Sequence, residues 1–343
     1  MRIGIDLMEG DSSPHLLFPA VLQAASMLDL SHQFLVIVTK DVAEKLSERL
    51  NAPENVKVRP SIAFHVVADT IAMEDDPLGA VRRKKGSSIV VGMRLLKKRR
   101  IDAFVSCGNT GALIASAALS LPKLPGIKRP ALLAALPAER GSVAVIDVGG
   151  NVYCKARHLI QFAYLGAAYQ RAVNDIPVPT IGLLNVGIES KKGTQELREV
   201  YEFLEAHCQP KLGETAFGMK FVGNMEGRDV FKGEVDVLVT DGFTGNVLLK
   251  TAEGAASFIF SSLIETLKDN LSVDLKQVLS ELQKQFNYAE YPGAIVCGVE
   301  GIVIKAHGSA SAGALLNSIL GAVNYVQRGI ISLIKTHLES LHT

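Results

Sequence analysis

Short apolar runs alternate with longer amphipathic segments along most of the chain, and this alternation restricts the fold more than any other feature of the sequence. The runs that read as buried strands are 2–6, 33–38, 56–61, 103–107, 131–136, 142–148, 179–186, 220–224 and 235–241. The helix-length segments between them include 15–29, 87–100, 111–120, 155–173, 194–207 and 246–268. Strands separated by helices are typical of a mostly parallel sheet covered on both faces. We therefore predict an α/β fold in three layers, α/β/α.

Composition limits the class of protein. A chain of 343 residues with 48% hydrophobic residues can bury a large core, and no linker, repeat or composition shift divides it, so we expect one domain over 1–343 with room for two lobes. A net charge of +1 gives no field that attracts nucleic acid, and we expect no such partner. The four cysteines form no CxxC pair, which favours a reducing compartment over a disulfide framework or zinc site.

The first residues enter a strand-like run directly, and no stretch reaches the roughly 18 apolar residues of a membrane span. We therefore predict a cytoplasmic protein that is neither secreted nor membrane-spanning.

Several predicted strands end in turns rich in glycine and asparagine. These turns are 106–115, 147–153, 183–193, 221–229 and 240–250. In a parallel sheet they would fall at the carboxyl ends of the strands and converge on one crevice, where ligands of open α/β folds bind. Glycine allows close approach of the backbone, and N–H groups at a helix start form a seat for anions. The pattern predicts a site for phosphate or for an oxyanion formed in acyl transfer, although each turn alone is also explained by turn formation.

Motifs that would indicate other chemistry are absent from the sequence. It contains no GxxxxGK[ST] phosphate loop, no full GxGxxG fingerprint and no GxSxG nucleophile elbow. Cys107, in "CGNTG", could be a nucleophile if a helix N-terminus lowered the pKa of its thiol. We favour the alternative, in which Cys107 is a small buried side chain at a strand end.

Seven segments together resemble one known family. They are "GIDLMEGDSSP", "RRKKGSS", "SCGNTGALIA", "IDVGGNV", "LLNVGIESKKG", "FVGNMEGRDVFKGEVDVLVTDGFTGNVLLK" and "GVEGIVIKAHGSA". Over about 2–330 the chain resembles the bacterial phosphate acyltransferases of phospholipid synthesis. The resemblance implies transfer of a long-chain fatty acyl group from acyl carrier protein to inorganic phosphate, which yields acyl phosphate for a membrane glycerol-3-phosphate acyltransferase. It also implies a homodimer without a cofactor, whose fold is similar to phosphate acetyltransferase and the isocitrate and isopropylmalate dehydrogenases.

The chain departs from the family pattern at a few loop positions. The residues that stand where the family commonly has others are Glu9, Cys107, Gly150, Ile188, Ser190 and Pro292. These departures affect the local geometry of the loops. They leave the expected reaction class unchanged.

The chemistry of this reaction suits the residue types in the turns. A thioester is already activated, and its thiol leaves as thiolate because its pKa is about 8.5, so no covalent enzyme nucleophile is needed. The catalyst must hold a phosphate oxygen against the carbonyl carbon, stabilise the oxyanion and exclude water. Backbone N–H groups of 108–111 and 242–246, asparagine amides and a cation can do this.

We therefore list candidate site residues in two groups. The catalytic candidates are Asn109, Lys192, Asn246 and His307. The candidates for binding substrate or phosphate are Asp6, Gly108, Thr110, Gly111, Asp147, Asn151, Asn185, Asn224, Glu226, Arg228, Asp241, Gly242, Thr244 and Gly245. His307 would bind phosphate or protonate the leaving sulfur, or else make a structural bond at a strand end. The carboxylates could hold a divalent metal, but we expect them to orient donors and predict no metal.

Two further segments suggest partners. The basic runs 82–85 and 97–100 bracket a predicted helix capped by Ser87 or Ser88, and they either complement the helix dipole or dock the acidic acyl carrier protein. The segment 257–291 reads as an amphipathic helical hairpin with more apolar surface than one face needs. It packs in the core or a dimer, or, as the resemblance implies, it protrudes and contacts the inner face of the cell membrane.

Two rival functions stay open at this point. The first is a relative of the same fold, either a short-chain phosphate acyltransferase or a decarboxylating dehydrogenase that depends on NAD and a metal. The second is a noncatalytic scaffold of lipid synthesis, which only the amphipathic segment supports. Dependence on phosphate and on acyl-chain length separates them from the predicted reaction.

Overall fold

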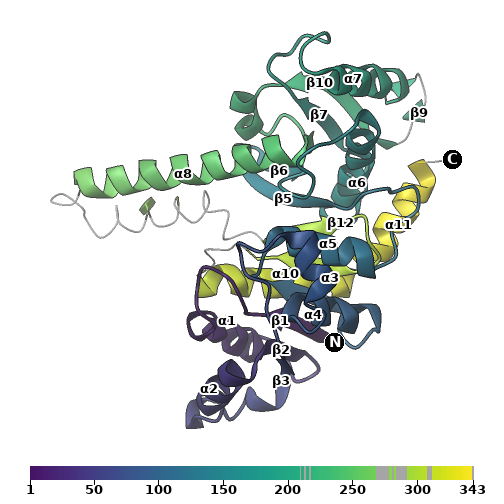
Figure 1. Cartoon of the computed structure of the whole chain (residues 1–343). Coiled ribbons are helices and arrows are strands. Elements are labelled where there is room, and N and C mark those ends of the chain that lie inside the picture. The colour runs from purple at the N-terminus through teal and green to yellow at the C-terminus, as the bar shows by residue number, and fades with distance from the viewer. Residues whose placement is uncertain are drawn as a thin grey trace.

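The computed structural model describes residues 1–208, 210–211, 214–215, 218–267, 278–279, 282, 292–306 and 311–341 (Figure 1). The strands are β1 (Arg2–Asp6), β2 (Gln33–Thr39), β3 (Ile62–Val67), β4 (Ala103–Ser106), β5 (Ala131–Ala138), β6 (Gly141–Ile146), β7 (Thr180–Leu184), β8 (Pro210–Lys211), β9 (Glu214–Thr215), β10 (Lys220–Met225), β11 (Val237–Val239), β12 (Ala294–Cys297) and β13 (Ile302–Lys305). The α-helices are α1 (Pro14–Met27), α2 (Lys40–Leu50), α3 (Pro77–Arg83), α4 (Ser88–Lys97), α5 (Thr110–Ser120), α6 (Ala156–Asn174), α7 (Gln195–His207), α8 (Gly242–Leu267), α10 (Ala312–Arg328) and α11 (Ile330–Leu341).

One 11-stranded sheet runs through the molecule in the order β10-β7-β11-β6-β5-β12-β13-β4-β1-β2-β3. Its outer parts are parallel: β1, β2, β3, β4 and β13 run one way, and β6, β7, β10 and β11 form a second parallel group. Between them the pairs β13/β12, β12/β5 and β5/β6 are antiparallel. Three reversals mean that the two parallel groups point in opposite directions. The prediction of a mostly parallel sheet is confirmed.

Helices cover both faces of this sheet. One buried cluster contains side chains of α1, α2, α6, α7, α10 and α11, and the other contains side chains of α3, α4, α5 and α8. Successive strand residues alternate between the two clusters, as Ala144 and Val145 of β6 do. This alternation is what a sheet buried on both sides requires, because neighbouring side chains point to opposite faces.

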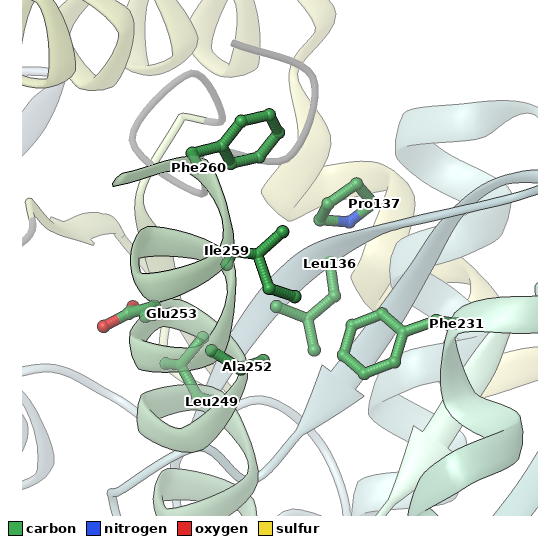
Figure 2. A pocket seen from close by; sticks show the side chains of 10 residues that line it. Leu136, Pro137, Phe231, Leu249, Ala252, Glu253, Ile259 and Phe260 are labelled. Carbon is green, nitrogen blue, oxygen red and sulfur yellow. The ribbon is translucent and has the colours of Figure 1, made fainter. Parts of the chain in front are cut away.

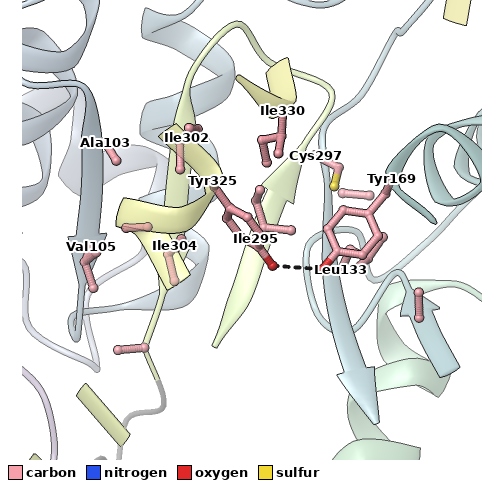
Figure 3. Close-up of a cluster of buried hydrophobic side chains, with 14 of the residues drawn as sticks. Ala103, Val105, Leu133, Tyr169, Ile295, Cys297, Ile302, Ile304, Tyr325 and Ile330 are labelled. Carbon is pink, nitrogen blue, oxygen red and sulfur yellow. Dashed lines mark hydrogen bonds between the residues drawn. The ribbon is translucent and has the colours of Figure 1, made fainter. Parts of the chain in front are cut away.

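The C-terminal part of the chain closes the middle of the sheet. β12 and β13 insert between β5 and β4 and place Ile295 and Ile304 in the core (Figure 3). On this face the hydroxyl groups of Tyr169 in α6 and Tyr325 in α10 lie 2.8 Å apart and share a hydrogen bond. The pair joins a helix of one half to a helix of the other.

Three sequence-based predictions need correction. No strand forms over 56–61: 3₁₀ turns cover Pro53–Asn55 and Arg59–Ser61, and β3 begins at Ile62. Pro60 explains the shift, because proline has no N–H for a sheet ladder. β12 and β13 were absent from the predicted strands. Ser87 does occupy the N-cap of α4, but its hydroxyl makes no capping bond.

α8 differs from every other helix of the described chain. It is 26 residues long and extends away from the body (Figure 1). By length and composition it could cross a membrane, which corrects the expectation that no stretch would, and unlike the core helices most of it is not buried. α8 has this composition without an unbroken apolar run, because small residues stand among the apolar ones between the helix start and Phe258. The second limb of the predicted hairpin, over 268–291, falls almost wholly outside the described residues.

Candidate active site

A turn at the end of β6, residues 147–151, is organised by one buried carboxylate; we call it the Asp147 turn. Oδ1 of Asp147 accepts from the N–H groups of Leu132 (3.0 Å), Gly149 (3.2 Å) and Gly150 (2.8 Å). Oδ2 accepts from the amide of Asn151 at 2.7 Å. Burial raises the pKa of Asp147, and these bonds partly oppose the shift. The carboxylate therefore fixes the backbone of the turn and has no exposed surface to offer a ligand.

The first turn of α8 is locked against the Asp147 turn. Asp241 caps it, accepting from Thr244 N–H at 2.7 Å, and Gly242 N–H donates to the carbonyl of Asn151 at 2.8 Å. Gly245 N–H donates to the carbonyl of Asp241 at 2.9 Å. These three N–H groups are thus engaged within the fold. A side-chain cap, a bond to the Asp147 turn and the first helical bond use these three hydrogens, so in this structure they are not available to an oxyanion.

Glycine is required at 245 for a packing reason. A Cβ atom there would lie 2.0 Å from the carbonyl oxygen of Asp147. The next residue, Asn246, is exposed and its amide lies against Gly149, whose own φ is +139°. No hydrogen bond joins the Asn246 side chain to the described part of the chain, so its amide can donate to a ligand.

Two neighbouring turns follow β7 and β10. Asn185 accepts from Val186 N–H at 2.8 Å and donates to the carbonyl of Lys192 at 3.2 Å. Asn224 donates to the carbonyl of Glu189 at 2.8 Å. Its Oδ1 is buried without a partner in the described structure. Both amides therefore hold the 185–193 loop in place.

The charged candidates of these turns lie at the surface. Lys192 is exposed and makes no ion pair with the described residues. Arg228 is largely exposed and pairs with Glu226. The ammonium of Lys192 is therefore the freer cation of the two.

A crevice of about 570 Å³ lies between α8 and the 185–197 loop. It is lined by Tyr153, Cys154, Leu159, Leu184, Asn185, Val186, Gly193, Thr194, Glu196, Leu197, Gly227, Thr240, Asp241, Thr244, Val247, Leu248 and Thr251. Its size is within the usual range of small-molecule sites. Of the predicted residues, it brings together Asn185, Asp241 and Thr244.

A second polar group lies at the ends of β1, β4 and β13. Asp6 is fully buried and accepts from Ser106 Oγ at 2.8 Å and from Met8 N–H at 3.0 Å; burial raises its pKa to about 6. Gly108 N–H donates to Ser106 Oγ at 3.1 Å. Asn109 caps α5, accepting from Ala112 N–H at 3.0 Å.

The amide of Asn109 is fully used by the fold. Its Nδ2 donates to the carbonyls of Ala72 (3.2 Å) and Met73 (3.1 Å), which accounts for both hydrogens. Thr110 and Gly111 form the first turn of α5 behind it. The catalytic role predicted for Asn109 has no donor left to support it.

The sequence reading missed Lys305 beside this group. Its ammonium is buried and donates to the carbonyls of Cys107, at 3.2 Å, and Ala306. Burial lowers its pKa. Its place at the end of an apolar run before "AHGSA" was the available signal. His307 lies outside the described residues.

The predicted single crevice is thus divided. The turns after β6, β7, β10 and β11 share one edge of the sheet, whereas β4 points the other way, so the 107–111 turn does not line the crevice. The two groups meet where Ile114 of α5 lies 3.3 Å from the Cβ position of Gly150. The antiparallel pairs in the middle of the sheet cause the division.

Cys107 is not poised as a nucleophile. It is completely buried, and burial raises the pKa of its thiol to about 12. The nucleophile is the thiolate, so the thiol of Cys107 is inert at neutral pH. The alternative that it is a small core residue agrees with this environment.

The fold and its strand-end turns define an α/β protein with a ligand-binding edge on its sheet, and comparison with known proteins identifies its family. The family model described as "Fatty acid synthesis protein" matches residues 1–333. The chain is 38% identical to the phosphate acyltransferase of Chlamydia pneumoniae over 340 residues, 98% of this chain and 99% of the relative. It is also 38% identical to that of Brevibacillus brevis over 347 residues, 99% and 98% of the two chains. The chain belongs to the phosphate acyltransferase family and is an acyltransferase.

Solved structures with a similar fold support the architecture alone. A phosphotransacetylase from Staphylococcus aureus has a TM-score of 0.56 at 14% identity, covering 96% of this chain and 94% of that one. A 4-hydroxythreonine-4-phosphate dehydrogenase from Klebsiella pneumoniae has a TM-score of 0.52 at 14% identity, covering 95% and 99%. The specific likeness to isocitrate and isopropylmalate dehydrogenases stays a prediction.

Proposed function

We propose that the protein transfers a long-chain fatty acyl group from acyl carrier protein to inorganic phosphate. The observation that carries this proposal is the near full-length match to phosphate acyltransferases, with 38% identity over 340 residues. The product is an acyl phosphate, which supplies a membrane glycerol-3-phosphate acyltransferase for phospholipid synthesis. We propose one catalytic domain over 1–343.

The reaction is a direct attack. A phosphate oxygen forms a bond to the thioester carbonyl carbon, the C–S bond breaks, and the sulfur leaves as thiolate. The buried, inert thiol of Cys107 supports a route without an acyl-enzyme. Orientation and oxyanion stabilisation then supply most of the acceleration.

We assign the active donor role to Asn246. Its exposed amide lies at Gly149, and nothing in the described chain satisfies it. Lys192 supplies a mobile cation for phosphate. Asp147, Asn151, Asp241, Gly242 and Gly245 hold the turn that presents Asn246, and Asn185 and Asn224 hold the loop that carries Lys192.

In this proposal the second polar group, which does not line the crevice, supplies a second seat for an anion. Asp6 and Ser106 position the backbone of Gly108, and the N–H groups of Thr110 and Gly111 lie in the first turn of α5, where the helix dipole favours an anion. Lys305 adds positive charge there. His307 keeps its predicted role as a phosphate ligand or proton donor.

We propose that acyl carrier protein docks on the basic runs. Arg82 and Arg83 lie in the last turn of α3, and Lys97 in the last turn of α4. Exposed cations attract an acidic protein over about 10 Å at moderate salt, and added salt screens them.

We also propose peripheral contact with the inner face of the cell membrane through α8. Its distal part exposes Phe258 (72%), Ile259 (54%) and Ile264 (43%). A helix of this kind can lie in a membrane interface or in the contact of a homodimer. Membrane contact would deliver acyl phosphate where the next enzyme works.

The test is a turnover assay with palmitoyl thioester of acyl carrier protein and graded phosphate. We expect thiol release and hydroxylamine-trapped acyl phosphate to rise together and saturate with phosphate. A series from C4 to C16 separates this function from a short-chain acyltransferase. Thiol release that ignores phosphate, or a preference for C4, would contradict the proposal.

A further inference from the structure

An apolar pocket of about 270 Å³ lies beside the candidate active site, at the base of α8. It is lined by Leu136, Pro137, Phe231, Leu249, Ala252, Glu253, Ala255, Ala256, Ile259 and Phe260. In Figure 2 the side chains of Leu136, Phe231 and Ile259 converge across the pocket. The pocket therefore presents hydrocarbon on three sides: the end of β5, the 227–232 segment and α8.

Glu253 belongs to this lining, but its charge lies outside the pocket. The carboxylate of Glu253 points to the other side of α8 in Figure 2, and it pairs with Lys250 at 2.9 Å. A ligand in the pocket would meet mostly apolar atoms. Such a lining favours an aliphatic chain over a polar group, because a polar group would lose its hydration without gaining partners.

The pocket and the crevice lie next to each other along α8. α8 lines the crevice with Thr244, Val247, Leu248 and Thr251, and it lines the pocket from Leu249 onward. The same 3₁₀ segment borders both, with Gly227 on the crevice and Phe231 on the pocket. Two walls are thus common to the two spaces.

The pocket is elongated along the helix. Its lining runs from Leu249 to Phe260, eleven steps of α8, or about 17 Å at 1.5 Å per residue. Its near end is one helical turn from Asn246. A chain that leaves the reacting carbonyl beside Asn246 and follows α8 would enter it directly.

We propose that this pocket binds the hydrocarbon tail of the acyl substrate and sets the preference for chain length. The inference rests on the proposed function and adds to it a location for the tail. Ala252 and Ala256, both half-buried, are the specificity-determining positions, since their small side chains leave the space open.

The test fills the pocket from the helix side. Ala256→Leu shortens the space, and Ser257→Leu is the matched control because it adds a similar group at an exposed position outside the lining. Each methylene that is kept from burial weakens binding by about fourfold. We expect Ala256→Leu to lower the C16 to C8 ratio of kcat/KM by at least about tenfold, with Ser257→Leu unchanged.

A binding measurement gives a second readout that does not depend on turnover. Calorimetry with dodecanoate on the full chain should show binding that Ala256→Leu weakens and Ser257→Leu does not. If wild type lacks phosphate-dependent turnover but binds dodecanoate in this way, the proposed function fails and the pocket assignment stands.

Other results would overturn the proposal. The first is an equal loss of kcat/KM for C8 and C16 in Ala256→Leu, and the second is unchanged selectivity and dodecanoate binding in that variant. The third is a change in sedimentation alone, which would assign the pocket to contact between copies of the chain. If Ala256→Leu does not fold, Ala252→Leu fills the same space one turn earlier and is read by the same two measurements.

Discussion

In two turns of similar composition, the asparagine side chains have different roles. Both the 107–111 turn and the 241–246 turn follow buried strands, and both combine glycine with asparagine. In the 107–111 turn the amide of Asn109 is consumed by a helix cap and two carbonyls. Beside the Asp147 turn the amide of Asn246 is exposed and makes no bond to the described chain. The difference teaches that hydrogen-bond accounting, and not residue type, separates a structural amide from an available one.

The largest expected effect comes from breaking the packing of α8 on the Asp147 turn. Gly245→Val places carbon where the Asp147 carbonyl already lies, with a Cβ contact of 2.0 Å. We expect a loss of more than about 4 kcal/mol in the free energy of unfolding, or no folding at all. Urea denaturation measures it. Gly254→Val is the matched control, since a Cβ there meets nothing within 4 Å; equal losses in both variants would contradict the packing argument.

The next effect separates the two asparagines directly. Asn246→Ala should lower phosphate-dependent kcat by about 10²–10³-fold, the value of one oxyanion donor, with little change in thermal unfolding. Asn109→Ala should instead cost about 1 kcal/mol of stability through the lost cap. Turnover is measured beside unfolding for both. The distinction between the two asparagines is wrong if Asn246→Ala retains full turnover, or if its loss of turnover is explained by its unfolding.

A smaller effect concerns pH and the second polar group. Burial raises the pKa of Asp6 to about 6 from 3.8, so the folded protein holds this proton more tightly than the unfolded chain does. Stability should therefore fall as pH rises from about 3.8 to 6, and the loss is complete above 6. We expect the stability of Asp6→Asn relative to wild type to improve by about 2 kcal/mol between pH 4.5 and 7.5. A pH-independent difference in urea unfolding would argue against a protonated Asp6.

The smallest effect is expected at Cys107. Cys107→Ala should cost about 1 kcal/mol, as an average core substitution does, and keep most of the turnover. The reason is that its thiol is buried with a pKa of about 12. Mass spectrometry after quenching provides the measurement. An acyl group on Cys107 in the wild-type protein would overturn direct attack.

The sequence was sufficient for the layered fold and for most strands, because strands buried on both faces appear as unbroken apolar runs such as 143–146. It failed for β12 and β13, and where Pro60 interrupts an apolar stretch. The sequence also could not predict that the site is divided, since strand direction depends on pairing between residues far apart in sequence.

For the site, the sequence predicted a set of residues. It did not predict the hydrogen bonds and packing contacts that these residues make. Asp147, Asn151 and Gly245 were chosen for ligand chemistry, yet the structure uses them to build the turn. Lys305 escaped notice because a lysine at the end of a strand is usually solvated, whereas here it is buried.

The late position of β13 has a consequence for synthesis on the ribosome. β4, at residues 103–106, lies between β1 and β13, and its partner at 302–305 is made last among the strands. At 5–20 residues per second the ribosome needs about 10–40 s to travel that distance. Throughout this time the nascent N-terminal half carries an unpaired strand edge, the kind of surface that pairs with other chains. With this topology, the edge of β4 needs protection from other chains during translation until β13 has been made.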